Sequence, residues 1–260
     1  MQNKEQILAK LKDKPAENVN IKNFINNYGV DSSAFVNDSL FIRGTSDKQW
    51  VYFSCFNESD FRVLENMLAP DDNYFAVIED WQLNILLEKR KLIWKLSTLR
   101  LIYPDKEPEE KISPEYVCRP LSTIDAGYIY DNSRYKKYTS LSYIKQRIKT
   151  GPSIGLFQKN ALLGWILTHD DGAMGFLHVH DDYRRKGLGT QITVAMIKHL
   201  KSKGEIPFVH IEEDNINSLQ LAWKLGFEKD RTIHWIKSEV KSEVNPELKP
   251  ELKTELKGDK

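Results

Sequence analysis

A short polar turn between two apolar runs constrains this chain more than any other feature. Asp181–Thr190 (DDYRRKGLGT) follows the strand-like run Met174–Val179 and precedes Ile192–Leu200, whose apolar residues have helical spacing. The first amides of a helix have no partner within it, the helix dipole favours negative charge, and glycine lets a ligand approach the backbone. This order of elements predicts a phosphate-binding turn, and hence a nucleotide-type cofactor.

Composition narrows the class of protein. A length of 260 residues indicates one or two domains, and 40% hydrophobic residues can bury a sizeable core. The net charge of +1 gives no overall basic field, so we expect no nucleic-acid partner. Cys55 and Cys118 lie far apart and fit neither a metal site nor a disulfide framework, which favours reduced thiols.

The same reasoning predicts a location. No apolar run approaches the roughly 18 residues that a membrane span needs, so no membrane partner is expected. Residues 1–6 are polar and resemble neither a signal peptide nor an Arg-rich transit peptide. The cytoplasm is therefore the expected compartment.

Proline and charge divide the chain. Pro104–Lys111 is a charged, proline-punctuated segment, and the predicted division is an N-terminal αβ domain (1–110), a second domain (111–237) and a tail (238–260). The tail repeats Lys, Glu, Pro and Leu without aromatic residues, which favours a disordered, solvated segment over a short partner-binding one.

Periodicity predicts alternating elements in both domains. In the first domain, helices are expected over 5–11, 21–28 and from Asn57 or Ser59 to Leu68, and strands over 39–43 and 49–56. In the second domain, strands are expected over 116–119, 153–158, 162–169, 174–180, 208–212 and 227–235, and helices over 122–132, 141–149, 190–203 and 217–225.

Two motifs of the second domain carry a family resemblance. Arg184-x-x-Gly187-x-Gly189 resembles the acyl-CoA motif of the GCN5-related N-acetyltransferase (GNAT) superfamily. Asn215-x-x-Ser218, followed by Leu225-Gly226-Phe227, is similar to that family's second signature. The resemblance covers roughly 116–236. The residues of the turn, the length of the chain and its weakly patterned first half resemble the glycine N-acyltransferase-like branch of the superfamily. This resemblance leaves a mitochondrial location open.

The resemblance implies a fold and a co-substrate. The fold is α/β, a mixed, mostly antiparallel sheet flanked by helices, preceded by a smaller, degenerate copy of the same unit. The co-substrate is acetyl-CoA or another acyl-CoA, without a metal. The residues that the family pattern assigns to it are Leu177, Val179, Arg184, Arg185, Lys186, Gly187, Leu188, Gly189, Thr190, Asn215 and Ser218. Simpler roles stay open: a glycine-assisted helix start, a solvated charge run, and a helix cap at Asn215.

Catalytic residues are less clear, because the sequence departs from the family pattern. Ala173 and Gly175 occupy the positions where relatives carry a base, and Ala222 the position of their acid. His178 and Glu212 are the remaining candidates. Strand alternation puts His178 on the face opposite Ala173 unless a bulge re-aims it. The other histidines are interpreted as structural or solvent-facing, and Asp170–Gly172 as a hairpin turn rather than a metal site.

The predicted function is transfer of an acyl group from CoA to a primary amine, such as glycine or another small amine. A CoA-binding module without catalysis and a protein-lysine acetyltransferase remain alternatives. The oligomeric state is not predicted. One further cluster, which covers the acceptor site in the family, is a candidate for selecting the substrate: Tyr128, Tyr130, Arg134, Tyr135, Lys136, Lys137 and Tyr138.

Overall fold

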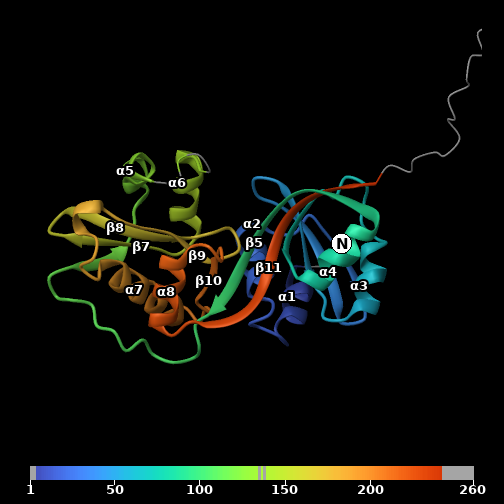
Figure 1. The fold of residues 1–260 in the computed structure, drawn as a ribbon, viewed down its shortest axis with the longest axis horizontal. Helices are drawn as coiled ribbons and strands as arrows, with labels where there is room; N and C mark the ends of the chain where they lie inside the picture. The colour runs from blue at the N-terminus through green and yellow to red at the C-terminus, as the bar shows by residue number, and fades with distance from the viewer. Residues whose placement is uncertain (1–3, 134–135, 137–138, 242–260) are drawn as a thin grey trace, which may run out of the picture.

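The computed structural model describes residues 4–133, 136 and 139–241, and its strands form one mixed sheet between helices (Figure 1). The strand order is β1-β2-β3-β4-β11-β5-β10-β9-β8-β7-β6. Two neighbouring pairs, β3 with β4 and β9 with β10, are parallel, and the other pairs are antiparallel. The α/β fold predicted from the sequence is confirmed.

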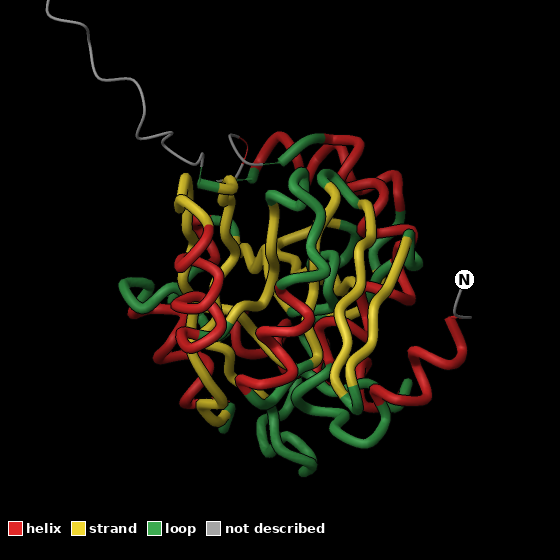
Figure 2. Tube along the Cα trace, turned by 90° about the vertical axis from the view of Figure 1, so that its right-hand side faces the viewer, coloured by secondary structure: helices red, strands yellow, loops and turns green. Residues whose placement is uncertain are grey.

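The N-terminal half begins with two helices and three strands, after which helices and strands alternate. In chain order its elements are α1 (Lys4–Leu11), α2 (Val19–Tyr28), β1 (Ser32–Val36), β2 (Ser39–Thr45), β3 (Gln49–Ser54), α3 (Glu58–Glu65), β4 (Tyr74–Ile78), α4 (Asp80–Lys89) and β5 (Arg90–Ile102). Figure 2 looks onto this half and shows its helices packed beside its strands.

The C-terminal half follows the predicted order closely. It contains β6 (Val117–Pro120), the 3-10 turn η1 (Thr123–Asp125), α5 (Ala126–Asn132), α6 (Leu141–Thr150), β7 (Ser153–Gln158), β8 (Ala161–Thr168), β9 (Met174–Val179), the 3-10 turn η3 (Asp181–Tyr183), α7 (Leu188–Ser202), β10 (Phe208–Ile211), α8 (Ile216–Leu225) and β11 (Glu228–Val240).

The two halves exchange their last strands. β11, at the end of the second half, lies between β4 and β5 of the first half. β5, at the end of the first half, pairs along its last residues with β10 of the second half. β5 and β11 also pair with each other along almost their whole length, so the exchanged strands form the seam between the halves (Figure 1).

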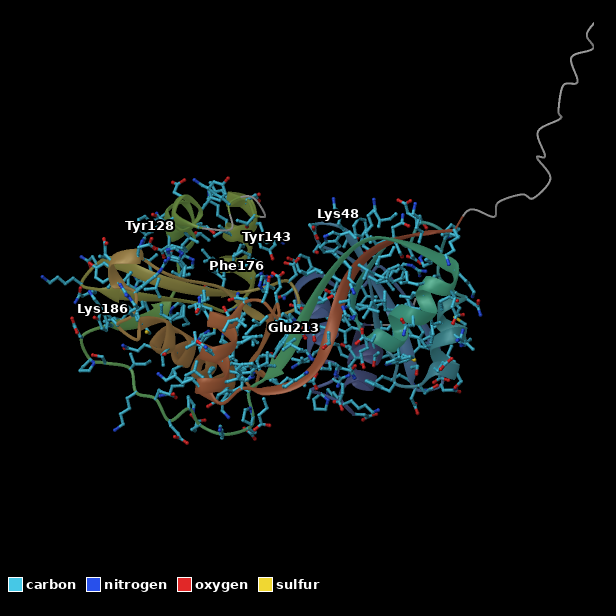
Figure 3. All side chains as sticks on the ribbon, in the orientation of Figure 1. Lys48, Tyr128, Tyr143, Phe176, Lys186 and Glu213 are labelled. Carbon is cyan, nitrogen blue, oxygen red and sulfur yellow. The ribbon has the colours of Figure 1, made fainter. Side chains whose placement is uncertain are left out.

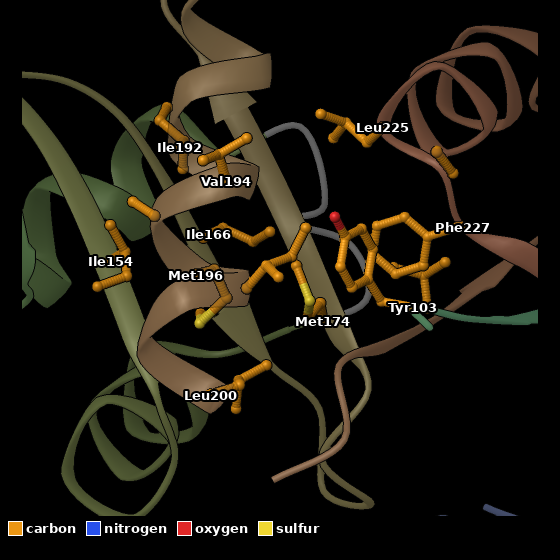
Figure 4. Close-up of a cluster of buried hydrophobic side chains, with 14 of the residues drawn as sticks. Tyr103, Ile154, Ile166, Met174, Ile192, Val194, Met196, Leu200, Leu225 and Phe227 are labelled. Carbon is orange, nitrogen blue, oxygen red and sulfur yellow. The ribbon is translucent and has the colours of Figure 1, made fainter. Parts of the chain in front are cut away.

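The core of the C-terminal half lies between its sheet and α7. Ile192, Met196 and Leu200 recur at helical spacing on α7 and are buried against strand residues that include Ile154 and Met174 (Figure 4). This packing fixes the start of α7, and therefore the glycine turn, relative to β9. Hydrophobic burial of this kind contributes roughly 25 cal/mol per Å² of apolar surface.

The predicted start of the tail is wrong. Ser238 is fully buried and its hydroxyl accepts a hydrogen bond from Arg90 Nε at 3.0 Å, so 238–240 continue β11 rather than begin a solvated segment. The long antiparallel pairing with β5 extends this strand past the charged residues that suggested a boundary. The rest of the predicted tail, 242–260, lies outside the described residues.

Candidate functional site

The glycine turn has a left-handed residue and open space at the start of α7. Gly187 is the N-cap of α7 with φ of 75°, a left-handed conformation that favours glycine, and a Cβ placed there would meet no atom within 4 Å. In the described part of the chain, no hydrogen-bond acceptor serves the backbone N–H groups from Arg185 to Thr190. The first amide after them, that of Gln191, bonds to the Gly187 carbonyl at 3.2 Å. The helix start therefore offers consecutive amides to a ligand.

The Arg184 side chain contacts residues on the N-terminal side of the glycine turn. Its Nε donates to the Val179 carbonyl at 3.0 Å, and its guanidinium pairs with the Asp181 carboxylate at 2.5 Å. The side chain thus ties the end of β9 to η3. Sequence reasoning placed Arg184 among the cofactor ligands; in the structure its side chain has partners within the protein.

Two further cations lie on the open side of the turn. Arg185 and Lys186 are exposed, and Lys186 Nζ lies 5.1 Å from the centre of the Tyr183 ring. Figure 3 shows Lys186 at the outer end of the C-terminal half. These charges complement a polyanion near the free amides.

β9 and β10 form a fork next to this turn. The two parallel strands pair at a single position, Met174 with Val209, so their later residues have no strand-to-strand register. β9 also contains a bulge, because Phe176 and Leu177 together face one residue of β8 and Phe176 has φ of 53°. The backbone edge of β9 after Met174 is therefore not paired with β10.

The bulge changes which face each β9 residue occupies. Leu177 and Val179 pack toward the core under α7, whereas Phe176 packs toward α5 and α6. His178 lies on the side of Phe176, where its ring stacks on Trp165 at 4.3 Å between centroids. Because of the bulge, His178 lies on the face of the sheet to which strict alternation along β9 would not assign it.

His178 lines a surface pocket of about 500 Å³ beside the end of β9. The pocket is also lined by Tyr128, whose hydroxyl is 2.8 Å from His180 Nε2, and by Asp181 and Asp182. Tyr128, a member of the predicted aromatic and basic cluster, therefore lines this pocket. Four of its members lie outside the described residues: Arg134, Tyr135, Lys137 and Tyr138.

The residues of the second motif occupy the start of α8. Asn215 is the N-cap of this helix, and its side chain accepts a hydrogen bond from the Ser218 amide at 3.2 Å. Asn215 is exposed, as is Glu212 just past the end of β10. Leu221 of α8 and Leu177 of β9 lie about 4 Å from where a Cβ on Gly189 would be, so α8, β9 and the glycine turn converge beside the fork.

A buried polar cluster at the junction of the halves was missed by sequence reasoning. Asp171 Oδ2 lies 2.6 Å from Asn20 Nδ2 and 3.1 Å from His210 Nε2, and the side chains of Asp171 and His210 are only 5% and 7% exposed. Asp170, next to it, accepts a hydrogen bond from the Tyr28 hydroxyl at 2.6 Å. The hairpin turn is therefore the contact between β8–β9 and α2, a role that spacing within one half cannot indicate.

Electrostatics at this cluster favour a charged carboxylate. Burial by itself raises the pKa of Asp171, but the charge of His210 and its hydrogen bond outweigh burial and hold that pKa below its ordinary range. Burial lowers the pKa of His169, whose ring lies over Gly175. Burial first, and Asp170 second, raise the pKa of Tyr143.

Comparison with known proteins agrees with this geometry. Residues 153–236 match the family model described as FR47-like protein. Together with the fold and the two motifs, this match supports the predicted resemblance to the GCN5-related N-acetyltransferase superfamily.

The individual relatives have low sequence identity to this chain. The human protein named glycine N-acyltransferase-like protein 1 is 28% identical over 128 residues, which are 48% of this chain and 42% of that protein, so the match spans less than half of the relative's length. A Drosophila protein structure has a TM-score of 0.69 at 18% identity, covering 90% of this chain and 95% of that one. A tandem GNAT protein from the clavulanic acid biosynthesis pathway has a TM-score of 0.55 at 14% identity, covering 92% and 95%.

A membrane-spanning helix must be both long and apolar. Across residues 4–133, 136 and 139–241, none is both long and apolar enough to cross a bilayer.

Proposed function

We propose that this protein is an acyl-CoA-dependent N-acyltransferase that transfers an acyl group from the CoA thioester to a primary amine. The observation that carries the proposal is the run of amides from Arg185 to Thr190, which have no acceptor among the described residues and which include that of the left-handed Gly187 at the start of α7. Such a turn suits a diphosphate, because each oxygen can accept from a backbone N–H that has no other partner.

The residues around the turn fit the rest of CoA. Arg185 and Lys186 would balance its phosphate charges, while Arg184 would keep the turn in shape through Val179 and Asp181. The edge of β9 that does not pair with β10 would accept the amides of the pantetheine arm at Leu177, as an added strand does, next to the Val179 carbonyl that Arg184 already contacts. Asn215 and Ser218 would stand beside the arm as well as capping α8.

The fork would bring the acyl group to the face that carries Phe176 and His178. Attack of a neutral amine on a thioester needs positioning and a donor for the carbonyl oxygen, and a β9 amide at the bulge can be that donor. Ala173 and Ala222 cannot transfer protons, so the usual family positions for base and acid contribute nothing here. A positioned base adds typically 10²–10⁴ in rate, so direct transfer survives their loss.

The acceptor is proposed to be a small primary amine. The similarity to glycine N-acyltransferase-like protein 1 supports glycine or another amino acid, and an arylalkylamine is the second choice. The length of the acyl chain is left open by these features. Cytoplasm is the proposed compartment, and a mitochondrial one would follow from a role like that of the glycine N-acyltransferases.

Two variants of glycine test the phosphate site. Gly187→Glu places a carboxylate against the diphosphate and should weaken CoA binding, measured by calorimetry, by at least about 100-fold, since like charges in contact cost several kcal/mol. Gly204→Glu is the matched control: Gly204 also has a left-handed φ of 70° and open space for a side chain, but follows the far end of α7. Equal CoA affinity in both variants would reject the assigned site.

Turnover tests the reaction. Mass spectrometry of wild-type protein with several acyl-CoAs and amines should detect an acylated amine. CoA binding without any product would favour a CoA-binding module, and acylation of protein lysines but of no free amine would favour a protein-lysine acetyltransferase.

A further inference from the structure

The ring of His169 lies directly over the backbone of Gly175. His169 starts the hairpin turn after β8: its amide donates to the Ala173 carbonyl at 2.8 Å, and its carbonyl accepts from the Gly172 amide at 3.0 Å. Its Nε2 and Cδ2 atoms occupy the space that a side chain at position 175 would need. Because Gly175 has no side chain, an imidazole from the neighbouring strand can approach the backbone of β9.

Gly175 stands at the base of the fork. It directly follows Met174, which pairs with β10, and directly precedes Phe176, where the bulge begins. Gly175 pairs with Leu167, whose side chain packs toward α5 and α6, so the ring over Gly175 lies on that face of the sheet. The ring also contacts Phe176, at 4.7 Å between centroids. His169 therefore borders the fork on the face to which the proposed function brings the acyl group.

The imidazole of His169 is available for proton transfer. Neither ring nitrogen has a hydrogen bond to another described residue, and His169 is partly exposed. Nδ1 of His210, in contrast, is buried without a partner. A neutral imidazole with a ring nitrogen that no protein group occupies can accept the proton of a reacting amine.

Burial keeps this imidazole in its basic form. Burial is the largest influence on the pKa of His169 and lowers it, so the neutral ring is the form present at neutral pH. The two carboxylates of the hairpin oppose this shift, and the basic groups of α6 and β10 reinforce it. The charged or titratable groups that surround the ring are Tyr28 on α2, Tyr143 and Arg147 on α6, Asp170 and Asp171 in the hairpin, and His210 on β10.

The N-terminal half holds the hairpin that carries His169. Asn27 Nδ2 donates to the Asp170 carbonyl at 2.7 Å, and the Tyr28 hydroxyl donates to the Asp170 carboxylate at 2.6 Å. Both residues belong to α2. These contacts fix the residue next to His169 relative to the other half of the protein.

We infer that His169 is the proton acceptor of the acyl transfer, and that Gly175 is the residue that admits its ring to the fork. The inference rests on the proposed function. It also gives the N-terminal half a part in the reaction, because α2 holds the hairpin.

The step balances without a further reactant. The nitrogen of the acceptor bonds to the acyl carbon, and the carbon–sulfur bond breaks with its electron pair going to sulfur. The proton lost by the amine passes to a ring nitrogen of His169. The imidazolium then releases this proton to solvent, and the thiolate takes one up, so the products are the amide and free CoA.

The first test compares His169→Ala with His199→Ala. His199 is the matched control, because it is also partly exposed and burial also lowers its pKa, but it lies on α7 at the opposite face of the sheet. His169→Ala should lower kcat/KM by about 10²–10⁴ and remove the decline of rate at low pH, with CoA affinity in calorimetry unchanged. Imidazole added to the buffer should restore part of the rate. His199→Ala should match wild type.

A second test addresses the contact between the ring and Gly175. Gly175→Ala adds a methyl group where the ring lies, and position 175 is outside the left-handed region, so alanine fits its backbone. Alone, this change should lower kcat/KM at least about tenfold by displacing the imidazole. In His169→Ala the same methyl group should change kcat/KM less than about twofold, because the ring is absent. Equal effects in the two backgrounds would contradict the assigned contact.

The outcomes separate the two proposals. Undiminished kcat/KM with an unchanged pH profile in folded His169→Ala would overturn the role of His169 and leave the acyltransferase standing. Failure of wild type to acylate any amine would overturn both. If the thermal midpoint shows that His169→Ala does not fold, the wild-type protein decides: the His169 imidazole, followed by NMR, must titrate over the pH range in which kcat/KM declines, and a different range overturns the inference.

Discussion

The two halves of this protein share an order of elements and differ at one turn. In each half three strands lead into a helix, a parallel strand, a second helix and a long last strand: β1-β2-β3-α3-β4-α4-β5 and β7-β8-β9-α7-β10-α8-β11. The helix that follows the third strand is α3 in one half and α7 in the other. What precedes each helix decides what its first amides can bind.

The turn before α3 is closed to anions. Asn57 caps this helix by accepting a hydrogen bond from the Asp60 amide at 2.8 Å, and Glu58 and Asp60 add negative charge to the first turn. The turn before α7 has no side-chain cap, carries Arg185 and Lys186, and passes through a left-handed glycine. The shared order of elements therefore does not by itself give both helix starts the same ligand. The residues at each start decide what its first amides can bind.

Removal of the exchanged strand should have the largest effect. A chain ending at residue 227 lacks β11, which fills the space between β4 and β5 and buries Ile233, Ile236 and Ser238. We expect loss of cooperative folding in both halves, measured by circular dichroism and thermal melting. A chain ending at residue 241 is the control and should melt like the full chain. A folded N-terminal half in the shorter chain would contradict the structural dependence of that half on β11.

The junction should be the next most sensitive region. Asp171→Asn leaves His210 without its buried carboxylate, and breaking a buried pair typically costs about 3–5 kcal/mol of unfolding free energy. Because the pKa of Asp171 is lowered in the folded state, its contribution is complete above the unfolded value of about 3.9 and is lost as pH falls toward the folded one.

Urea unfolding of wild type and Asp171→Asn across pH would show this dependence. The gap in unfolding free energy should be constant at neutral pH and narrow below about pH 4. A gap that stays the same at all pH values would mean that the carboxylate charge contributes nothing.

The smallest expected loss of stability comes from removing the side-chain caps of α3 and α8. Asn57→Ala and Asn215→Ala each remove a side-chain cap and should each cost about 1 kcal/mol in chemical denaturation. Only Asn215→Ala should also weaken CoA binding in calorimetry, because α8 borders the fork and α3 does not. Reduced CoA affinity in Asn57→Ala would argue against the contrast between the halves.

The C-terminal half was largely predictable because its signals are local. The glycine turn, the periodic face of α7 and the cap at Asn215 all act within a few residues of one another. In the N-terminal half, β1, β4, α4 and β5 were not predicted. β5 runs through Arg90–Ile102 without clear alternation, and its partners β10 and β11 come from distant parts of the chain.

The position of the glycine turn was predictable from the sequence, and the surroundings of His178 were not. Alternation assigned His178 to the wrong face because a non-glycine residue, Phe176, adopts a positive φ and forms the bulge. The contacts of His210 with Asp171 and Asn20 were not predicted, because these residues meet only across the junction of the two halves. Contacts between halves leave no spacing pattern in a sequence.

The exchanged strands have a consequence for synthesis. A ribosome makes β5 long before β11 exists, so the nascent first half emerges with the β4 edge and one side of β5 exposed. Its sheet closes only when β11 has left the exit tunnel and paired with β4 and β5, so formation of this seam is a late step of folding during synthesis.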